Sequence, residues 1–318
     1  MSPLPSPRGW LLGPWRDSLL LANLAWPLVL LLPLLGDDLG ELQFWQVYFV
    51  TTPHRWITLP IVFLDRDRLD RGLWLFLGLA LVVVAIVAGI RLTTGTLLCL
   101  LTVDYLWNAW HFAAQHHGVY RIYCRVGGWN PSGEILTRWA MRGFLLYVTL
   151  RVVTSTWTTP WTVLEQLDWL AWCVPVALIA RHLWGVGLRL PGGLLYLASV
   201  SGLYSALLVA VHLRRTDAIL ALTLASALFH AVEYLTLVAR ATDERQAKLG
   251  DRMGWLGLIA TAGVVALIAF VLIVGAGSWY AEQNAAETWL LVNACVAFLH
   301  YSYDGIIWRR PSRPERST

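Results

Sequence analysis

Apolar stretches of about 20 residues recur along the whole chain, and short polar stretches separate them. Stretches of this length suffice for an α-helix to cross the hydrocarbon core of a membrane. We therefore predict an all-α protein: a polytopic integral membrane helix bundle of about ten transmembrane helices, forming a single transmembrane domain over residues 1–318. The predicted helices cover residues 18–35, 43–64, 73–90, 96–119, 141–156, 163–180, 192–213, 217–239, 254–277 and 287–308.

The composition agrees with this fold class. Of the 318 residues, 57% are hydrophobic and 14% are charged, and the mean hydropathy is +0.57. A soluble domain of this length would carry roughly a quarter charged residues, so little of the chain is left for one. The sequence shows no basic helix or RNA-binding motif, and we expect no nucleic-acid partner. Its four cysteines show no CxxC spacing and predict neither a disulfide framework nor a zinc ribbon.

Basic residues concentrate on alternate loops of the predicted bundle. With the N-terminus in the cytoplasm, the outer loops hold only Arg91, Arg214 and Arg215 of the 24 Lys and Arg residues. Lys and Arg are enriched in the cytoplasmic loops of membrane proteins. We therefore predict a multi-pass protein of the cell (inner) membrane, surrounded by membrane lipids, with both termini in the cytoplasm.

Four histidines lie inside the predicted membrane segments: His54, His111, His230 and His300. A bare imidazole is costly to bury in hydrocarbon, and it normally persists only when it pairs, binds a cofactor or lines a polar cavity. The four segments run in the same direction in the predicted topology. Each histidine should lie roughly 12–15 Å from the cytoplasmic boundary, because a helix rises 1.5 Å per residue. This common depth predicts one shared metal or cofactor site.

Each of these histidines lies on a polar stripe at helical spacing. The stripe around His54 includes Thr51 and Thr58, and Pro53 could bend that helix beside the histidine. Carboxylates, amides and hydroxyls are the groups that usually orient metal-bound imidazoles. The residues that we expect to orient the ligands, or to act as additional ligands, are Asp104, Asn108, Gln115, His116, His117, Glu233 and Asp304.

The residue types favour a particular chemistry. Neutral imidazole suits Fe, Cu, Zn and Ni, and several histidines with open positions among carboxylates fit non-haem Fe(II), which activates oxygen. We therefore expect iron, and an oxidoreductase or oxygenase that acts on an apolar small molecule arriving from the bilayer. Tyr234 and Tyr301 are candidate catalytic residues that could donate to bound oxygen. A cytoplasmic electron donor is the expected partner, because that surface is nearer to the histidines.

The segment WHFAAQHHG and the four single histidines on separate helices resemble the Brp/Blh family of membrane β-carotene oxygenases. The resemblance covers the histidine-bearing helices. It implies that His54, His111, His230 and His300 hold a non-haem iron that cleaves the central double bond of carotene to give retinal. The chain departs from the family's His-Gly-x-x-Asp-type motif, because HHGVY lacks the acid.

Other functions stay open on the sequence alone. Two histidines on facing helices can ligate a b-type haem, so haem is the alternative cofactor and electron transfer the alternative function. The chain could also be a non-catalytic subunit of a membrane complex, or a proton-coupled transporter with buried His, Asp and Glu. No P-loop, GxSxG elbow or GxGxxG fingerprint supports nucleotide binding or serine hydrolysis.

Some polar residues have no single predicted role. His116 and His117 could be ligands or interfacial residues, and His182 and His212 lie near helix ends without polar stripes. The charge of Arg55 beside His54 requires a partner inside the membrane. We expect that partner to be a carboxylate, such as Asp304 or Glu233, or a bound anion.

Overall fold

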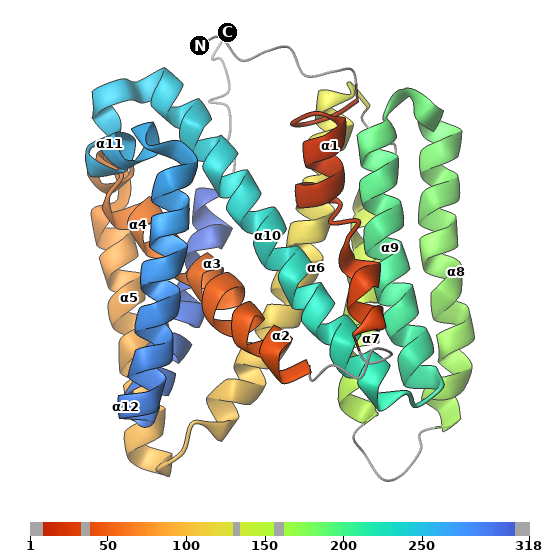
Figure 1. The fold of residues 1–318 in the computed structure, drawn as a ribbon, viewed down its shortest axis with the longest axis horizontal. Coiled ribbons are helices and arrows are strands. Elements are labelled where there is room, and N and C mark those ends of the chain that lie inside the picture. The colour runs from red at the N-terminus through yellow and green to blue at the C-terminus, as the bar shows by residue number, and fades with distance from the viewer. Residues whose placement is uncertain (1–8, 33–38, 130–133, 156–161, 309–318) are drawn as a thin grey trace, which may run out of the picture. The chain divides into compact units, whose positions relative to one another are not determined.

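The computed structural model describes residues 9–32, 39–129, 134–155 and 162–308, and the regular structure in these ranges is helical (Figure 1). The predicted all-α class is therefore confirmed. Five helices of the described ranges are long and apolar enough to cross a membrane. They are α5 (Arg66–Thr94), α8 (Thr162–Gly185), α9 (Pro191–His212), α10 (Thr216–Leu249) and α12 (Gly263–Ile307).

The chain divides into two compact units. Unit 1 contains residues 1–51 and 108–238, and unit 2 contains residues 52–107 and 239–318. Two long helices, α6 (Leu98–Val126) and α10, contribute residues to both units. The boundaries therefore fall within regular structure rather than in polar linkers. The single transmembrane domain stays a prediction.

Unit 1 is built around α9, which packs against α8 and α7 (Glu134–Thr154) (Figure 1). The turn η5 (Gly187–Arg189) leads into α9, which starts with Pro191, where the missing N–H of proline costs no helical hydrogen bond. In the most apolar stretch of α9, 61% of the residues are buried. Tyr196 and Leu203 of α9 pack with Tyr123 of α6 and Leu145 of α7 in the core of this unit.

The N-terminal segment of unit 1 is not the continuous helix that was predicted over residues 18–35. It forms short turns: α1 (Pro14–Arg16), η1 (Asp17–Leu21) and η2 (Trp26–Leu31). Asn23 interrupts them with a positive φ of 47°. Side-chain contacts replace helical hydrogen bonds here, because the buried Asp17 carboxylate accepts the backbone N–H groups of Leu11 and Leu12 at 2.7 and 2.8 Å. Residues 33–35 lie outside the described ranges.

Unit 2 is built around α12, which packs against α3 (Thr52–Trp56), α4 (Thr58–Phe63) and α5. Val62, Phe76, Leu299 and Tyr303 form a small core, and the Tyr303 hydroxyl donates to the Phe76 carbonyl oxygen at 2.8 Å. Only 11% of the residues in the most apolar stretches of α5 and α12 are buried. These helices therefore expose apolar surface of the kind that lipid or a partner covers.

The predicted helix at 43–64 is interrupted at the point that the sequence marked with Pro53. It consists of α2 (Leu39–Gln46), the π-helical turn η4 (Val47–Thr51), α3 and α4. Proline has no N–H to bond to the carbonyl four residues earlier, so a regular α-helix cannot pass through it unchanged. Single π-turns of this kind often accompany functional sites.

The last two predicted helices, at 254–277 and 287–308, lie on either side of a kink. The turn η6 (Gly250–Met253) and the short α11 (Trp255–Thr261) precede α12. Within α12, Ala285 departs from helical backbone angles, with φ −152° and ψ 52°, and two helices meet there. The kink falls inside the predicted gap at 278–286, although helical structure extends into most of that gap.

Candidate metal centre

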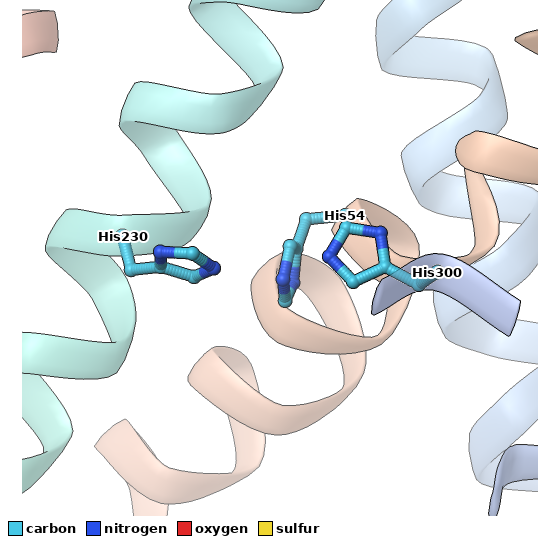
Figure 2. A group of neighbouring side chains, drawn as sticks. All are labelled: His54, His230 and His300. Atoms are coloured by element: carbon cyan, nitrogen blue, oxygen red, sulfur yellow. The ribbon is translucent and has the colours of Figure 1, made fainter. Parts of the chain in front are cut away.

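Unit 2 holds one pair of buried histidines. His54 lies on α3 and His300 on α12, and their side chains are almost completely buried, with exposed fractions of 1% and 0%. Their ring centroids are 5.0 Å apart and the ring planes are nearly perpendicular, at 85°. Figure 2 shows these two rings and also draws His230, which belongs to unit 1.

The His300 ring is held in place by its neighbours in unit 2. Thr58 Oγ1 lies 2.7 Å from His300 Nδ1, a hydrogen bond that fixes the ring orientation. Nε2 of the same ring lies 3.9 Å from Asp304 Oδ2, which is one turn further along α12. That distance is too long for a hydrogen bond but allows electrostatic attraction. Both Thr58 and Asp304 belong to the predicted polar stripes.

Asp104 and Tyr301 contact each other through the Tyr301 hydroxyl, and the Tyr301 ring packs against His300 with centroids 5.5 Å apart. The Tyr301 hydroxyl donates to Asp104 Oδ1 at 2.9 Å, so its hydrogen is already engaged. Arg55 Nη1 lies 3.9 Å from Asp104 Oδ2, and its guanidinium carbon lies 6.0 Å from the Tyr301 ring centroid. The carboxylate partner of Arg55 is therefore Asp104, and not Asp304 or Glu233 as the sequence had suggested.

Unit 1 holds a second pair with the same spacing. His111 on α6 and His230 on α10 have ring centroids 5.0 Å apart at an interplanar angle of 80°. The Phe112 ring stacks on His230, with centroids 3.8 Å apart and planes inclined by 18°. His230 is completely buried. Two further residues predicted for this region lie on the same helices, Asn108 partly buried on α6 and Tyr234 buried on α10.

A buried carboxylate next to this pair ties α6, α9 and α10 together. Gln115 Nε2 donates to Glu233 Oε1 at 2.7 Å and to the backbone carbonyl oxygen of His230 at 3.0 Å. The Tyr196 hydroxyl donates to Glu233 Oε2 at 2.7 Å. Glu233 therefore positions the helix that carries His230, and it contacts Gln115, Tyr196 and His116.

His116 belongs to this carboxylate cluster. It is completely buried, and its Nδ1 lies 2.8 Å from the Tyr196 hydroxyl oxygen and 3.3 Å from Glu233 Oε2. Because the only Tyr196 hydroxyl hydrogen goes to Glu233, His116 must be the donor, with its hydrogen on Nδ1. Sequence reasoning missed Tyr196, since α9 shows no polar stripe around it.

The neighbouring His117 has different surroundings. It is 4% exposed and lines a small cavity with Cys124, Glu134 and Thr137. Burial raises the pKa of the Cys124 thiol to about 11, so this thiol stays protonated at neutral pH.

The spacing of the two pairs can be compared with metal coordination. A ring centroid lies roughly 3.2 Å from a metal that the imidazole binds at about 2.0–2.1 Å. Two imidazoles at a tetrahedral angle therefore have centroids about 5 Å apart, and two on opposite sides of the metal have centroids about 6.4 Å apart. The observed 5.0 Å in each unit fits two adjacent ligands of one ion.

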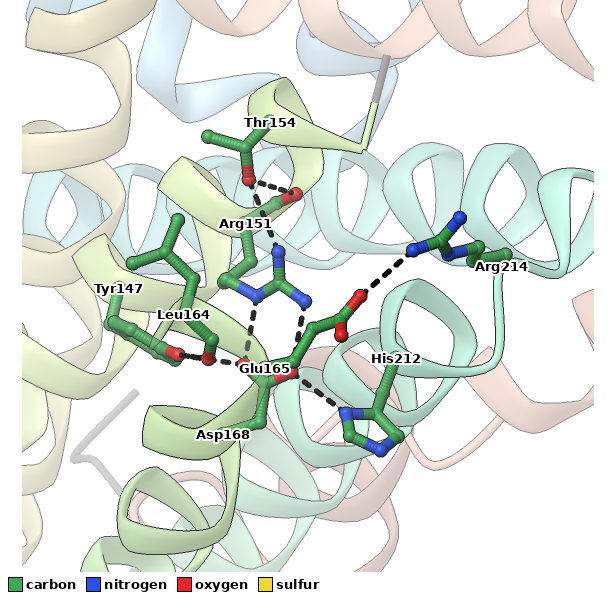
Figure 3. Close-up of polar contacts among 8 residues, drawn as sticks. All are labelled: Tyr147, Arg151, Thr154, Leu164, Glu165, Asp168, His212 and Arg214. Carbon is green, nitrogen blue, oxygen red and sulfur yellow. Dashed lines mark hydrogen bonds and ion pairs between the residues drawn. The ribbon is translucent and has the colours of Figure 1, made fainter. Parts of the chain in front are cut away.

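A second buried carboxylate in unit 1 forms a separate cluster (Figure 3). Asp168 on α8 accepts Arg151 Nε at 2.8 Å and Nη2 at 2.9 Å, the Tyr147 hydroxyl at 2.7 Å and His212 Nδ1 at 2.9 Å. The sequence offered a signal for it, because Arg151 and Asp168 are opposite charges in adjacent apolar segments. His212 therefore has a structural partner. His182 has one too, since its Nδ1 lies 2.9 Å from the Tyr120 hydroxyl.

No known protein family, curated protein or solved structure matches this chain. The described part of the chain is an all-α protein with five helices that could cross a membrane, and it contains buried histidine clusters that could hold a metal ion.

Proposed function

We propose that this chain is an integral membrane metalloprotein in which His54, His111, His230 and His300 bind one transition-metal ion. The observation that carries the proposal is the histidine pair in each unit, with the same 5.0 Å centroid spacing. Burying several imidazoles is costly unless they gain strong partners, and a metal ion is such a partner. The common depth of the four residues along their helices supports assigning both pairs to one ion.

The membrane location is part of the same proposal. Five long apolar helices support a membrane protein. About ten spans, an inner-membrane location and two cytoplasmic termini are our extension, and the distribution of Lys and Arg supports them.

Iron is the metal that we favour, because imidazoles among carboxylates suit Fe(II). When bound, it would supply oxygen-activating redox chemistry. The chain's own residues orient the ligands: Thr58 fixes the His300 ring, and Gln115 fixes the backbone of His230. Phe112 covers one face of His230 and excludes water from it. Such outer groups commonly set the orientation and basicity of metal-bound histidines.

The proposed reaction is an oxidation or oxygenation of an apolar small molecule that enters from the bilayer, with a cytoplasmic protein as electron donor where one is needed. The exposed apolar surfaces of α5 and α12 suit contact with such molecules. The resemblance of WHFAAQHHG to Brp/Blh oxygenases supports a carotenoid-like substrate. Haem is the weaker alternative, because axial ligands on opposite faces of a haem would be farther apart than 5.0 Å.

Elemental analysis and an optical spectrum of the purified full chain test this proposal. We expect about one equivalent of iron per chain without an intense Soret band, and oxygen consumption when a carotenoid is added to the reduced protein. A transition-metal content below about a tenth of an equivalent would refute the metal site. A Soret band near roughly 410–430 nm would replace it with haem ligation. Full iron without substrate-dependent oxygen consumption would refute the oxygenase alone.

A further inference from the structure

Unit 2 contains a large open groove at the start of α5, a helix that Figure 1 labels, and none of the four histidines lines it. Its volume is about 1010 Å³. This is the upper end of the range of roughly 300–1,000 Å³ that small-molecule sites occupy. One wall comes from residues 63–75, at the end of α4 and the beginning of α5, and the other from residues 254–258, at the beginning of α11.

The backbone explains why the groove is open and fixed. Inside α5, Gly72 departs from helical angles (φ −155°, ψ 21°), which bends the first turns away from the rest of the helix. On the other wall, Gly254 has a φ of +61°, and a Cβ there would lie 3.1 Å from Arg66 Cβ. The Leu256 N–H donates to the Leu64 carbonyl oxygen at 3.0 Å and joins the two walls.

Ion pairs connect Arg245 of α10 to two carboxylates at the start of α5. Arg245 Nη2 donates to Asp65 Oδ2 at 2.7 Å and to Asp67 Oδ2 at 3.1 Å. Asp65 is completely buried and also caps α5 by accepting the Arg68 N–H. Arg71, which lines the groove, also contacts Asp67 Oδ2 and keeps 65% of its side chain exposed, so this ion-pair network reaches the groove.

The lining of the groove combines apolar side chains with charged ones. Trp74 and Trp255 expose 83% and 70% of their surface, and Leu69, Leu73 and Leu258 continue the apolar surface. The rim carries two guanidinium groups and one carboxylate, from Arg66, Arg71 and Asp70. Arg66 and Asp70 are 76% and 71% exposed and 4.0 Å apart, so their weak pairing leaves both accessible to a ligand.

This arrangement has the complementary chemistry of a zwitterionic phospholipid. A soluble anion would use the arginines but not the exposed tryptophans and leucines, and a purely apolar molecule would leave the charges unused. The groove also lies where the charged start of α5 changes to its apolar membrane-length stretch, which is the level at which headgroups meet Trp and Arg side chains.

We propose that the groove binds one zwitterionic phospholipid, with its phosphate at Arg66 and Arg71, its ammonium group at Asp70 and an acyl chain along Trp74 and Trp255. The site lies within unit 2 and does not depend on metal binding. It is a specific lipid site, distinct from the general lipid contact of the exposed helix faces.

Native mass spectrometry of the delipidated full chain tests this site with added phosphatidylethanolamine, phosphatidylglycerol or inorganic phosphate. We expect one tightly held phosphatidylethanolamine, and about tenfold weaker retention in the Arg66→Ala/Arg71→Ala variant. Arg91→Ala is the matched control, because this arginine lies at the opposite end of α5 and pairs with Glu287. Asp70→Asn should keep lipid binding and lose the preference for phosphatidylethanolamine over phosphatidylglycerol.

Each contrary result overturns the site. If the wild type and the double variant retained phosphatidylethanolamine equally well, Arg66 and Arg71 would not bind the lipid. An equal loss in Arg91→Ala would identify general boundary lipid. Displacement of the lipid by inorganic phosphate alone would identify a soluble-anion site. An unchanged lipid preference in Asp70→Asn would remove the ammonium contact, and this variant serves the test even if the double variant does not fold.

Discussion

Asp168 and Glu233 are two of the carboxylates that unit 1 buries completely, and their partners differ. Asp168 meets the Arg151 guanidinium through two hydrogen bonds, so its charge is neutralised by a permanent cation. Glu233 has no Arg or Lys within ion-pair distance in the described ranges. Its contacts are an amide, a phenol and His116, which is charged only when it is protonated.

The difference separates a structural cluster from a candidate functional one. A buried ion pair with all its hydrogen bonds satisfied holds helices together, and removing one partner leaves an uncompensated charge. A buried carboxylate among neutral donors suits a different purpose, since it can orient or raise the basicity of groups around a metal ion. The Asp168 cluster should therefore affect stability, and the Glu233 cluster should affect metal binding.

The largest expected effect comes from Asp168→Asn. The substitution leaves the Arg151 charge buried without a counter-charge, and we expect a loss of about 3–5 kcal/mol in the free energy of unfolding. Denaturant unfolding of the purified protein measures this loss. The double variant Arg151→Met/Asp168→Leu, which removes both charges, should recover most of it. A loss below about 1 kcal/mol in Asp168→Asn would contradict the structural role.

Glu233→Gln should have a smaller effect on stability and a specific effect on metal binding. The amide keeps an acceptor for Gln115 or Tyr196 but removes the negative charge, and we expect about 10–100-fold weaker metal affinity. Competition with a chelator measures that affinity. The comparison fails if Glu233→Gln unfolds as easily as Asp168→Asn while its metal affinity stays at the wild-type value.

A matched pair of tyrosine variants gives the smallest effects. Tyr147 donates to Asp168 and Tyr196 donates to Glu233, both at 2.7 Å. Tyr147→Phe should cost about 1 kcal/mol of unfolding free energy and leave metal affinity unchanged, because it removes one hydrogen bond from a structural cluster. Tyr196→Phe should weaken metal affinity by a few-fold. Identical behaviour of the two variants would remove the distinction between the clusters.

The sequence predicted which polar side chains share one face of a helix better than it predicted which side chains on other helices they contact. The polar stripes include Thr58 and Gln115, because spacing along a helix determines which side chains share a face. In the structure these residues contact His300 and the backbone of His230. The pairing of Arg55 with Asp104 and the contact of Tyr196 with Glu233 depend on how separate helices pack. A single sequence does not specify that packing, so these contacts could not be predicted.

For the fold, the sequence predicted most of the long helices but not where some of them are interrupted. Helices α5, α6, α8, α9 and α10 occur where apolar segments were expected, because long apolar stretches leave the backbone few alternatives to a helix. The segments at 18–35 and 43–64 were wrong as continuous helices, because Asn23 and Pro53 interrupt their regular backbone.

Metal stoichiometry in two pair variants tests the central claim most directly. One variant is His54→Ala/His300→Ala and the other is His111→Ala/His230→Ala, with His212→Ala as a control histidine from the Asp168 cluster. If the four histidines bind one ion, both pair variants fall from about one equivalent of iron to below about a tenth, and the control keeps its iron. Retention of the full equivalent by either pair variant would contradict a shared site.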